Sequence, residues 1–255
     1  MHDNLNNQQK TVVITGGNRG IGLSMVSAYV KSGYNVIVGA RSSSSELDKL
    51  SNKVEVVDFD ARIEEDHLVL AQKAIDLTGR LDAYINNAGY SEWRPIDKID
   101  DDFLNDMIAT NLKGVIWGCK AAANVMDGNG SIINISSLAG KRGSKNNTCY
   151  CATKFAVNGI TQSLAKELGI KGIRVNAICP VLVKTDGLVE ALKDRESPAA
   201  GSPDVFFQQF SEQQSAMKRL PEANEISSAC LFLTSDQASA ITGQCINVDC
   251  GVLPQ

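Results

Sequence analysis

Histidine is scarce in this sequence, because only His2 and His67 occur among its 255 residues. Catalysis by a histidine base is therefore not expected. The seven cysteines are odd in number and include no Cys-x-x-Cys pair, a pattern that disfavours both a zinc site and a disulfide framework. We predict reduced thiols packed as small apolar residues, and we assign no metal ligands.

Long apolar runs are also absent. No stretch approaches the roughly 20 apolar residues that a membrane-spanning helix needs. The net charge of −4 gives no electrostatic basis for binding nucleic acid or an anionic membrane. Met1 to Gln9 is polar and lacks the apolar core of a signal peptide. We expect a flexible tail over residues 1–10, a cytoplasmic protein and a small-molecule substrate.

What the sequence does contain is an alternation of strand-like and helix-like segments. Apolar, β-branched runs predict strands at residues 11–15, 35–39, 53–57, 81–85, 131–135, 172–178 and 243–248, the sixth being broken by Cys179-Pro180. Helical periodicity predicts helices at about residues 21–32, 64–78, 103–126, 150–168 and 222–235. Residues 185–217 are expected to be an irregular substrate loop. Such alternation implies right-handed crossovers and a parallel sheet in one α/β domain, residues 11–255.

The first predicted strand runs directly into a glycine-rich turn. Gly16, Gly20 and Gly22 have the spacing GxxxGxG, and a helix is predicted immediately after them. Glycines allow a tight turn and a close approach of backbone to a ligand, and the N-terminus of a helix attracts a pyrophosphate. The turn is therefore predicted to bind a dinucleotide. A tight strand-to-helix turn without a ligand is the alternative.

The residues after the second predicted strand bear on the choice of nucleotide. An NAD-binding unit carries Asp or Glu about twenty residues after its glycine turn, whereas this chain has Ala40, Arg41 and Ser42 at that place. Arginine pairs with a 2′-phosphate, which a carboxylate would repel. Arg19, in the glycine turn, is placed to approach the same phosphate. We predict NADP in preference to NAD; two solvated surface arginines are the alternative.

Tyr150 and Lys154 lie four residues apart in a predicted helix and so share one face. An ammonium beside a phenol stabilises the phenolate and lowers the tyrosine pKa from its usual value of about 10. Such a tyrosine can exchange a proton with an alcohol or carbonyl oxygen near neutral pH. The same spacing is common on ordinary helix surfaces, so its meaning depends on the surrounding motifs.

Five ordered motifs together resemble the short-chain dehydrogenase/reductase superfamily: Thr15-Gly16-x-x-x-Gly20-Ile21-Gly22, Asn86-Asn87-Ala88-Gly89, Asn111, Ser137 and Tyr150-x-x-x-Lys154. The resemblance extends from Thr11 to about Gly251. It implies a Rossmann-type, doubly wound, seven-stranded parallel sheet with helices on both faces. It also implies hydride transfer between a nicotinamide and a carbon that bears an alcohol or carbonyl, and a homotetramer.

The resemblance also implies a role for each matching residue. Tyr150 is the general acid/base, Lys154 lowers its pKa and binds the nicotinamide ribose, Ser137 hydrogen-bonds the substrate oxygen, and Asn111 holds a proton-relay water. The implied cofactor-binding set is Gly16, Asn18, Arg19, Gly20, Ile21, Arg41, Ser42, Asp60, Ala61, Asn87, Ala88, Gly89, Tyr150, Lys154, Pro180, Val183 and Thr185.

Two positions depart from the family pattern, because Val181 and Cys250 stand where the family usually has glycine. A β-branched Val181 restricts the loop beside the nicotinamide pocket. Cys250 strains the C-terminal turn if its φ is positive. Neither change removes a chemical group, so both bear on substrate geometry and not on the reaction.

Charged residues flank the expected substrate cleft: Lys141, Arg142, Lys145 and the run Glu92-Trp93-Arg94. One hypothesis is that some of them recognise an anionic or polyhydroxylated substrate, such as a sugar acid or an acyl carrier. Solvated loop charge is the alternative.

The sequence thus predicts an NADP(H)-preferring oxidoreductase that acts on CH–OH or C=O groups. A 3-oxoacyl-thioester reductase and a sugar or polyol dehydrogenase both remain open. Two other classes are a lyase or epimerase that uses the nicotinamide transiently and a non-catalytic nucleotide-binding protein. The last is disfavoured because Ser137, Tyr150 and Lys154 are all present.

Overall fold

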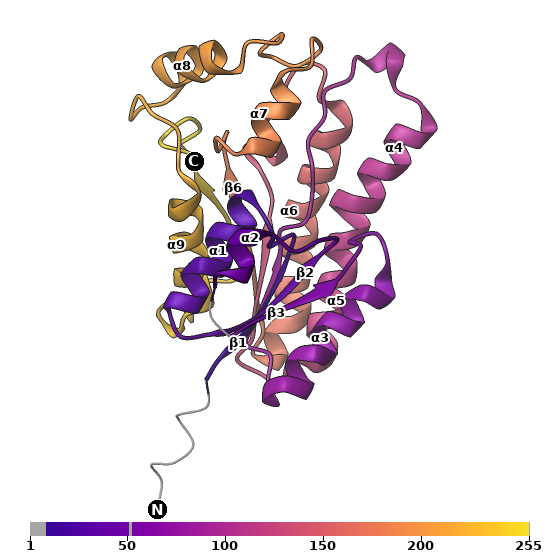
Figure 1. Ribbon diagram of the computed structural model, residues 1–255, viewed down its shortest axis with the longest axis vertical. Coiled ribbons are helices and arrows are strands. Elements are labelled where there is room, and N and C mark those ends of the chain that lie inside the picture. Colours follow the sequence, from indigo (N-terminus) through magenta and orange to yellow (C-terminus); the bar gives the residue numbers. More distant parts are fainter. Residues whose placement is uncertain (1–8, 51–52, 255) are drawn as a thin grey trace, which may run out of the picture.

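The computed structural model, which describes residues 9–50 and 53–254, contains one sheet of seven parallel strands (Figure 1). The strands are β1 Thr11–Thr15, β2 Asn35–Ala40, β3 Val54–Asp58, β4 Ala83–Asn86, β5 Ser131–Ile135, β6 Arg174–Pro180 and β7 Cys245–Val248. Their order is β3-β2-β1-β4-β5-β6-β7. The order reverses between β1 and β4, and ligands of such sheets bind beyond the carboxyl ends of the strands at that point. The predicted doubly wound Rossmann fold is confirmed.

Helices cover both faces of the sheet because successive strand residues point to opposite sides. In β1, Val12 and Ile14 pack toward one helical layer and Val13 toward the other, and all three are buried. The first layer contains α1 Gly20–Lys31 and α9 Ala223–Thr234, and the second contains α3 Glu64–Thr78, α5 Gly114–Val125 and α6 Thr148–Leu168. Shorter elements are α2 Ser45–Asp48 and the 3₁₀ turns Ile96–Lys98, Leu138–Gly140, Gly169–Lys171 and Asp236–Ala238.

The helix predicted over residues 103–126 is interrupted. It consists of α4 Asp101–Ile108, a π turn at Ala109–Lys113 and then α5. Helical periodicity does not reveal the extra residue of a π turn, and such turns are frequent at functional sites. Asn111 lies inside this one.

The segment 185–217 is not irregular, and that prediction was wrong. It forms two helices, α7 Asp186–Leu192 and α8 Pro203–Gln214, which lie above the carboxyl edge of the sheet (Figure 1). The Thr185 hydroxyl caps α7 by accepting the amide of Leu188 at 3.3 Å. Pro203 lies in the first turn of α8, where a helix tolerates a residue without an N–H.

Strand β6 also runs further than predicted, through Cys179 and Pro180. Pro180 pairs with Val248 of β7, whereas β5 ends at Ile135, opposite Ile178. Proline has no N–H to donate, and no residue of β5 lies opposite Pro180 to accept one, so the sheet loses no hydrogen bond there.

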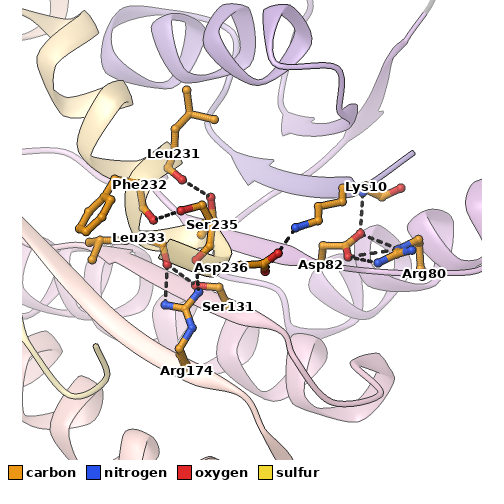
Figure 2. A network of polar contacts seen from close by, with 12 residues as sticks. Lys10, Arg80, Asp82, Ser131, Arg174, Leu231, Phe232, Leu233, Ser235 and Asp236 are labelled. Atoms are coloured by element: carbon orange, nitrogen blue, oxygen red, sulfur yellow. Dashed lines mark hydrogen bonds and ion pairs between the residues drawn. The ribbon is translucent and has the colours of Figure 1, made fainter. Parts of the chain in front are cut away.

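At the amino edge of the sheet, Arg174 binds the end of α9 (Figure 2). Its guanidinium donates to the carbonyls of Leu233 at 2.6 Å and Ser235 at 3.3 Å, and the Ser131 hydroxyl donates to Leu233 at 3.2 Å. Carbonyls at the C-terminal end of a helix lack partners within the helix, so these donors fix α9 to the sheet.

The ends of the chain are described only in part. The predicted tail, residues 1–10, lies outside the described residues except for Gln9 and Lys10. Lys10 forms an ion pair with Asp236 at 3.5 Å (Figure 2). Between residue 9 and residue 254, leaving aside residues 51 and 52, no helix combines the length and apolar character needed to cross a membrane.

The turn after β7 has the strain that the sequence suggested. Cys250 has φ +54° and Gly251 has φ +77°. The Asp249 carboxylate holds the turn by accepting the amides of Gly251 at 2.9 Å and Leu253 at 2.8 Å. A left-handed backbone is costly for a residue that has a Cβ.

We predict that Cys250→Gly raises the free energy of unfolding by about 0.5–1 kcal/mol, because relief of the left-handed strain exceeds the added chain entropy of glycine. Urea unfolding measures the change. Cys250→Ala removes the thiol but keeps the strain, so it should give no such gain. An equal gain from both variants would show that the thiol, and not the backbone, is responsible.

Candidate active site

The glycine turn is bound to the loop after β4 by partly buried hydrogen bonds. The Thr15 hydroxyl accepts the backbone amides of Asn87 and Ala88, each at 3.0 Å. The Asn87 side chain donates in return to the carbonyls of Thr15 at 2.9 Å and Gly16 at 3.1 Å. This clamp fixes the two strand ends between which a dinucleotide lies in this fold. Its use of Thr15 was not predicted from the sequence.

The glycines of the turn are required by its geometry. Gly16 and Gly20 have φ of +66° and +54°, and a Cβ on Gly22 would lie 2.1 Å from the Gly16 carbonyl oxygen. A Cβ on Gly20 would lie 3.2 Å from a methyl group of Thr185, so the loop after β6 reaches the glycine turn. The first turn of α1 carries no acidic residue and is open to an anion.

The predicted adenosine end lies beyond β2 and β3. Arg19 and Arg41 are exposed there, and the Asn18 amide donates to the Ser42 hydroxyl at 3.5 Å. Hydrogen bonds from Arg62 lower the pKa of Asp60, and Arg41 adds a smaller lowering by its charge. The Asp60 carboxylate is thus already paired with Arg62, a partner that the sequence analysis missed.

Lys154 is buried at the point where α6 meets the end of β5. Only 5% of its surface is exposed, and its Nζ donates to the Ile135 carbonyl at 2.9 Å. Burial lowers its pKa to about 8. Its Nζ lies 5.6 Å from the centre of the Tyr150 ring, which confirms that both residues share a helix face.

The predicted lowering of the Tyr150 pKa by Lys154 is not found. Burial raises the pKa of Tyr150 to about 12, and the only lowering contribution is a hydrogen bond with Ser137. Loss of water around the phenol outweighs that bond, and the Lys154 ammonium is directed to the Ile135 carbonyl. Sequence spacing shows that the residues are neighbours but not how far each is desolvated.

Ser137 follows β5 in an extended conformation, and its hydroxyl oxygen accepts the amide of Ala139 at 3.1 Å. The hydroxyl proton therefore remains for Tyr150 or a substrate oxygen. Tyr150 and Ser137, predicted as neighbours from two separate motifs, are in contact.

Asn111 is fully buried and supports the loop after β4. Its amide nitrogen donates to the Tyr90 carbonyl at 2.8 Å, and its oxygen accepts the Tyr90 amide at 3.0 Å. A Cβ on Gly89 would lie 2.9 Å from the Asn111 oxygen and 3.8 Å from Lys154 Nζ, so these three residues meet. The water-relay role of Asn111 stays a prediction.

The remaining predicted cofactor residues form the walls of the same edge. Ala88 lies against Gly16, where a Cβ would be 3.1 Å from the Ala88 Cα. Pro180 ends β6 and Val183 follows the strand; both are buried, and the Thr185 amide donates to the Val183 carbonyl at 2.7 Å. Ile21, in the first turn of α1, is partly buried and packs against the core.

Two of the cations proposed to recognise substrate are engaged within the protein. Arg94 pairs with Glu92 at 2.8 Å and Asp100 at 3.4 Å, and its guanidinium lies 3.9 Å from the centre of the Phe103 ring. Lys141 donates to the Cys245 carbonyl at 2.6 Å. Lys145 is exposed and Arg142 is half-buried.

Trp93 has a role that the sequence analysis did not predict. Its ring is buried in an apolar cluster with Leu192 at the end of α7 and Phe207 of α8. The Asn146 amide also donates to the Glu196 carbonyl, between these helices, at 2.9 Å. The sequence feature that could have indicated this role is a tryptophan within an otherwise polar loop. These contacts hold α7 and α8 against the loops that surround the site.

The glycine turn, the buried lysine beside a tyrosine and the strand-end loops define an oxidoreductase site on a nucleotide-binding Rossmann fold. A family model described as enoyl-(acyl carrier protein) reductase matches residues 16–253. The chain belongs to the short-chain dehydrogenase/reductase superfamily.

Similar proteins match over nearly their full length. The 3-oxoacyl-(acyl-carrier-protein) reductase FabG of Chlamydia muridarum is 33% identical, over 95% of this chain and 97% of that protein. An (S)-acetoin-forming diacetyl reductase of Staphylococcus aureus is 32% identical, over 95% and 97%. A crystal structure of a variant actinorhodin polyketide ketoreductase with NADPH has a TM-score of 0.87 at 27% identity, over 96% of this chain and 97% of that one.

The chain is accordingly an NAD(P)-dependent oxidoreductase. It transfers hydride between a nicotinamide cofactor and a secondary alcohol or carbonyl substrate.

We predict that Tyr150→Phe lowers kcat by about 10²–10⁴-fold, because it removes the proton donor while keeping the ring. NADPH binding, measured by fluorescence titration, should be unchanged. Cys149→Ala, one residue away, should retain turnover, since that buried thiol has no expected role. Substantial activity in Tyr150→Phe would exclude the phenol as the acid.

The pH dependence should differ between the two directions. With its pKa raised to about 12, Tyr150 stays protonated at working pH, so kcat/KM for reduction should not fall from pH 6 to 9 through loss of this proton. Oxidation needs the phenolate, so its kcat/KM should rise by up to about tenfold per pH unit over the same range. Steady-state rates in both directions measure this. A reductive profile that falls between pH 7 and 8 would mean that the working phenol has a lowered pKa.

Proposed function

We propose that this protein reduces an uncharged ketone with NADPH, using Tyr150 as the general acid. The observation that carries the proposal is the meeting of Tyr150, Ser137 and Lys154 at the carboxyl edge of the sheet. Ser137 lies close enough to Tyr150 to lower its pKa, and Lys154 is buried one helical turn away, beside Gly89. The set joins a proton donor, a second hydroxyl and a cation.

The residues at this edge fit a dinucleotide. The positive φ angles of Gly16 and Gly20 and the close approach at Gly22 form a turn of bare backbone at the N-terminus of α1. When bound, the nicotinamide supplies the hydride. The proposed contacts run from Gly16, Asn18, Arg19, Gly20 and Ile21 at the pyrophosphate, through Arg41, Ser42, Asp60 and Ala61 at the adenosine and Asn87, Ala88 and Gly89 at the adjoining ribose, to Tyr150, Lys154, Pro180, Val183 and Thr185 at the nicotinamide end.

The chain's own residues would manage the proton and the developing charge. Tyr150 gives its proton to the substrate oxygen, and Ser137 donates a second hydrogen bond to it, as in an oxyanion hole. Lys154 holds the nicotinamide ribose, and Asn111 supports a water that returns a proton. A phenol with a pKa of about 12 keeps its proton until the substrate is reduced.

Two features support an uncharged substrate. Arg94 and Lys141 are engaged by other groups of the protein. The helices α7 and α8 pack around Trp93 in an apolar cluster, against which the partly buried side chains of Leu188 and Val189 lie. A small ketone or a 3-oxoacyl thioester suits apolar surroundings of this kind better than a sugar. The diacetyl reductase and FabG relatives act on carbonyl groups of this kind, according to their names.

A substrate panel tests this choice. NADPH oxidation and NADP reduction would be followed with ketones, acyl thioesters, steroids and sugars. We expect the highest kcat/KM with a diketone or 3-oxoacyl thioester. A preference for an aldose would favour the sugar dehydrogenase. Product formation without net NADPH consumption would indicate a lyase or epimerase.

We further propose a cytoplasmic homotetramer in which residues 11–255 act as one domain. The exposed faces of α5 and α6 carry Ile116 and Phe155, which are 40% and 48% exposed. Apolar side chains on neighbouring helices are typical of an interface between subunits.

NADP preference is proposed from Arg41. It is exposed at the end of β2, lies close enough to Asp60 to lower the pKa of that carboxyl, and takes the place of the acid that binds NAD. The ketoreductase of similar structure was crystallised with NADPH.

We predict that Arg41→Asp shifts the ratio of kcat/KM for NADP to that for NAD by about 10–100-fold toward NAD, because the carboxylate repels the 2′-phosphate and accepts ribose hydroxyls. Lys49→Asp, which makes the same charge change on a neighbouring exposed residue, is the control. An unchanged ratio in Arg41→Asp would contradict the cofactor assignment.

A further inference from the structure

A buried histidine lies beneath the loop that follows β3. His67, in the first turn of α3, is only 1% exposed. Its Nδ1 lies 2.9 Å from the Tyr84 hydroxyl and its Nε2 lies 3.0 Å from the Ala61 carbonyl oxygen. The Phe59 ring packs edge-on against it, with ring centres 4.7 Å apart. The imidazole therefore joins the loop after β3 to the centre of β4.

These partners fix the proton on the ring. A carbonyl oxygen only accepts hydrogen bonds, so Nε2 carries the proton and donates to Ala61. Nδ1 then accepts from the Tyr84 hydroxyl. Burial lowers the pKa of His67, which keeps the ring neutral, and the neutral ring satisfies both partners without a buried charge.

Two consecutive residues of the loop after β3, Asp60 and Ala61, are each held by a residue of α3. The Asp66 carboxylate accepts the amide of Asp60 at 2.7 Å, while His67 binds the carbonyl of Ala61. That carbonyl is also covered from α5, because a Cβ on Gly114 would lie 2.6 Å from its oxygen. The loop has little freedom to shift relative to β4.

We propose that His67 is a positioning residue for the adenine end of the nucleotide site. The inference rests on the proposed function, in which Asp60 and Ala61 contact the adenosine. His67 does not touch the nucleotide. It fixes the loop that does, through the shared contact with Tyr84 on β4.

The polar chemistry of His67 and Tyr84 distinguishes a positioning role from ordinary core packing. An aliphatic side chain would fill the same apolar space without the cost of burying an imidazole and a phenol. Both polar groups instead bond across from α3 to β4 and to the loop. Arg41 is near enough to Asp60 to affect its pKa, so the loop position also sets where an adenine lies relative to the proposed 2′-phosphate site.

The test compares four variants with the wild type. His67→Leu removes both hydrogen bonds, and His67→Gln keeps an amide donor for the Ala61 carbonyl. Tyr84→Phe removes the hydroxyl alone. Tyr29→Phe is the matched control, because Tyr29 is another fully buried tyrosine whose hydroxyl bonds one residue, Thr234 at 2.8 Å, in the opposite helical layer. Calorimetry gives Kd for NADPH and for adenosine 2′,5′-bisphosphate, and urea unfolding gives stability.

We expect His67→Leu to raise both Kd values by about tenfold and Tyr84→Phe to raise them by less. His67→Gln should recover most of the affinity. kcat at saturating NADPH should stay within about twofold of wild type for every variant, since the nicotinamide end is untouched. Tyr29→Phe should lose stability with both Kd values unchanged.

Unchanged Kd values in His67→Leu would overturn the proposal, as would an equal rise in Tyr29→Phe. If His67→Leu does not fold, Tyr84→Phe decides, and wild-type Kd values in that variant would also overturn it. Failure of the wild type to bind either probe has a different meaning, because it removes the proposed nucleotide site itself. Weaker binding of NADPH without weaker binding of the bisphosphate would place the defect at the nicotinamide end and contradict the inference.

Discussion

The close packing of α6 against the end of β5 is the constraint on which the site depends. A Cβ on Gly140 would lie 2.6 Å from the Lys154 carbonyl oxygen, so the chain after β5 passes the helix at backbone contact distance. The Ser136 hydroxyl donates to that same carbonyl at 3.3 Å, and the Asn158 amide donates to the Gly140 carbonyl at 2.9 Å. Because these bonds join α6 directly to the segment that follows β5, Ser137 and Tyr150 are held close together.

That packing also determines the electrostatics. Lys154 reaches the Ile135 carbonyl only by entering the protein, and burial lowers its pKa to about 8. The same loss of water raises the pKa of Tyr150 to about 12. Both pKa shifts therefore favour the neutral side chain. The Tyr150 phenol retains its proton and can donate it, and the Lys154 ammonium loses its proton more readily. Such an arrangement suits delivery of a proton to a reduced carbonyl oxygen better than removal of one from an alcohol.

The nucleotide edge follows a different principle, because its backbone is fixed by hydrogen bonds from uncharged side chains. Thr15 and Asn87 bind the glycine turn to the β4 loop, and His67 and Tyr84 bind the β3 loop to β4. β4 is thus the common support for the pyrophosphate and adenosine parts of the proposed dinucleotide site. Charged side chains at this edge, such as Arg19 and Arg41, remain exposed where a phosphate can reach them.

The sequence by itself determined the strands and most helices, and it supplied the candidate reacting groups. An unbroken apolar run such as Val12-Val13-Ile14 indicates a strand that is buried on both faces, and the glycine turn needs residues without a Cβ. Both features can therefore be recognised from the local sequence. The spacing of Tyr150 and Lys154 likewise specifies a shared helix face. Tertiary structure decided what depends on distant partners. It packed α7 and α8 around Trp93 in a segment that reads as irregular, extended β6 through Pro180 beside β7, and inserted a π turn where Asn111 binds Tyr90. It also raised the Tyr150 pKa that spacing alone predicted to be lowered, because desolvation depends on residues that are remote in sequence.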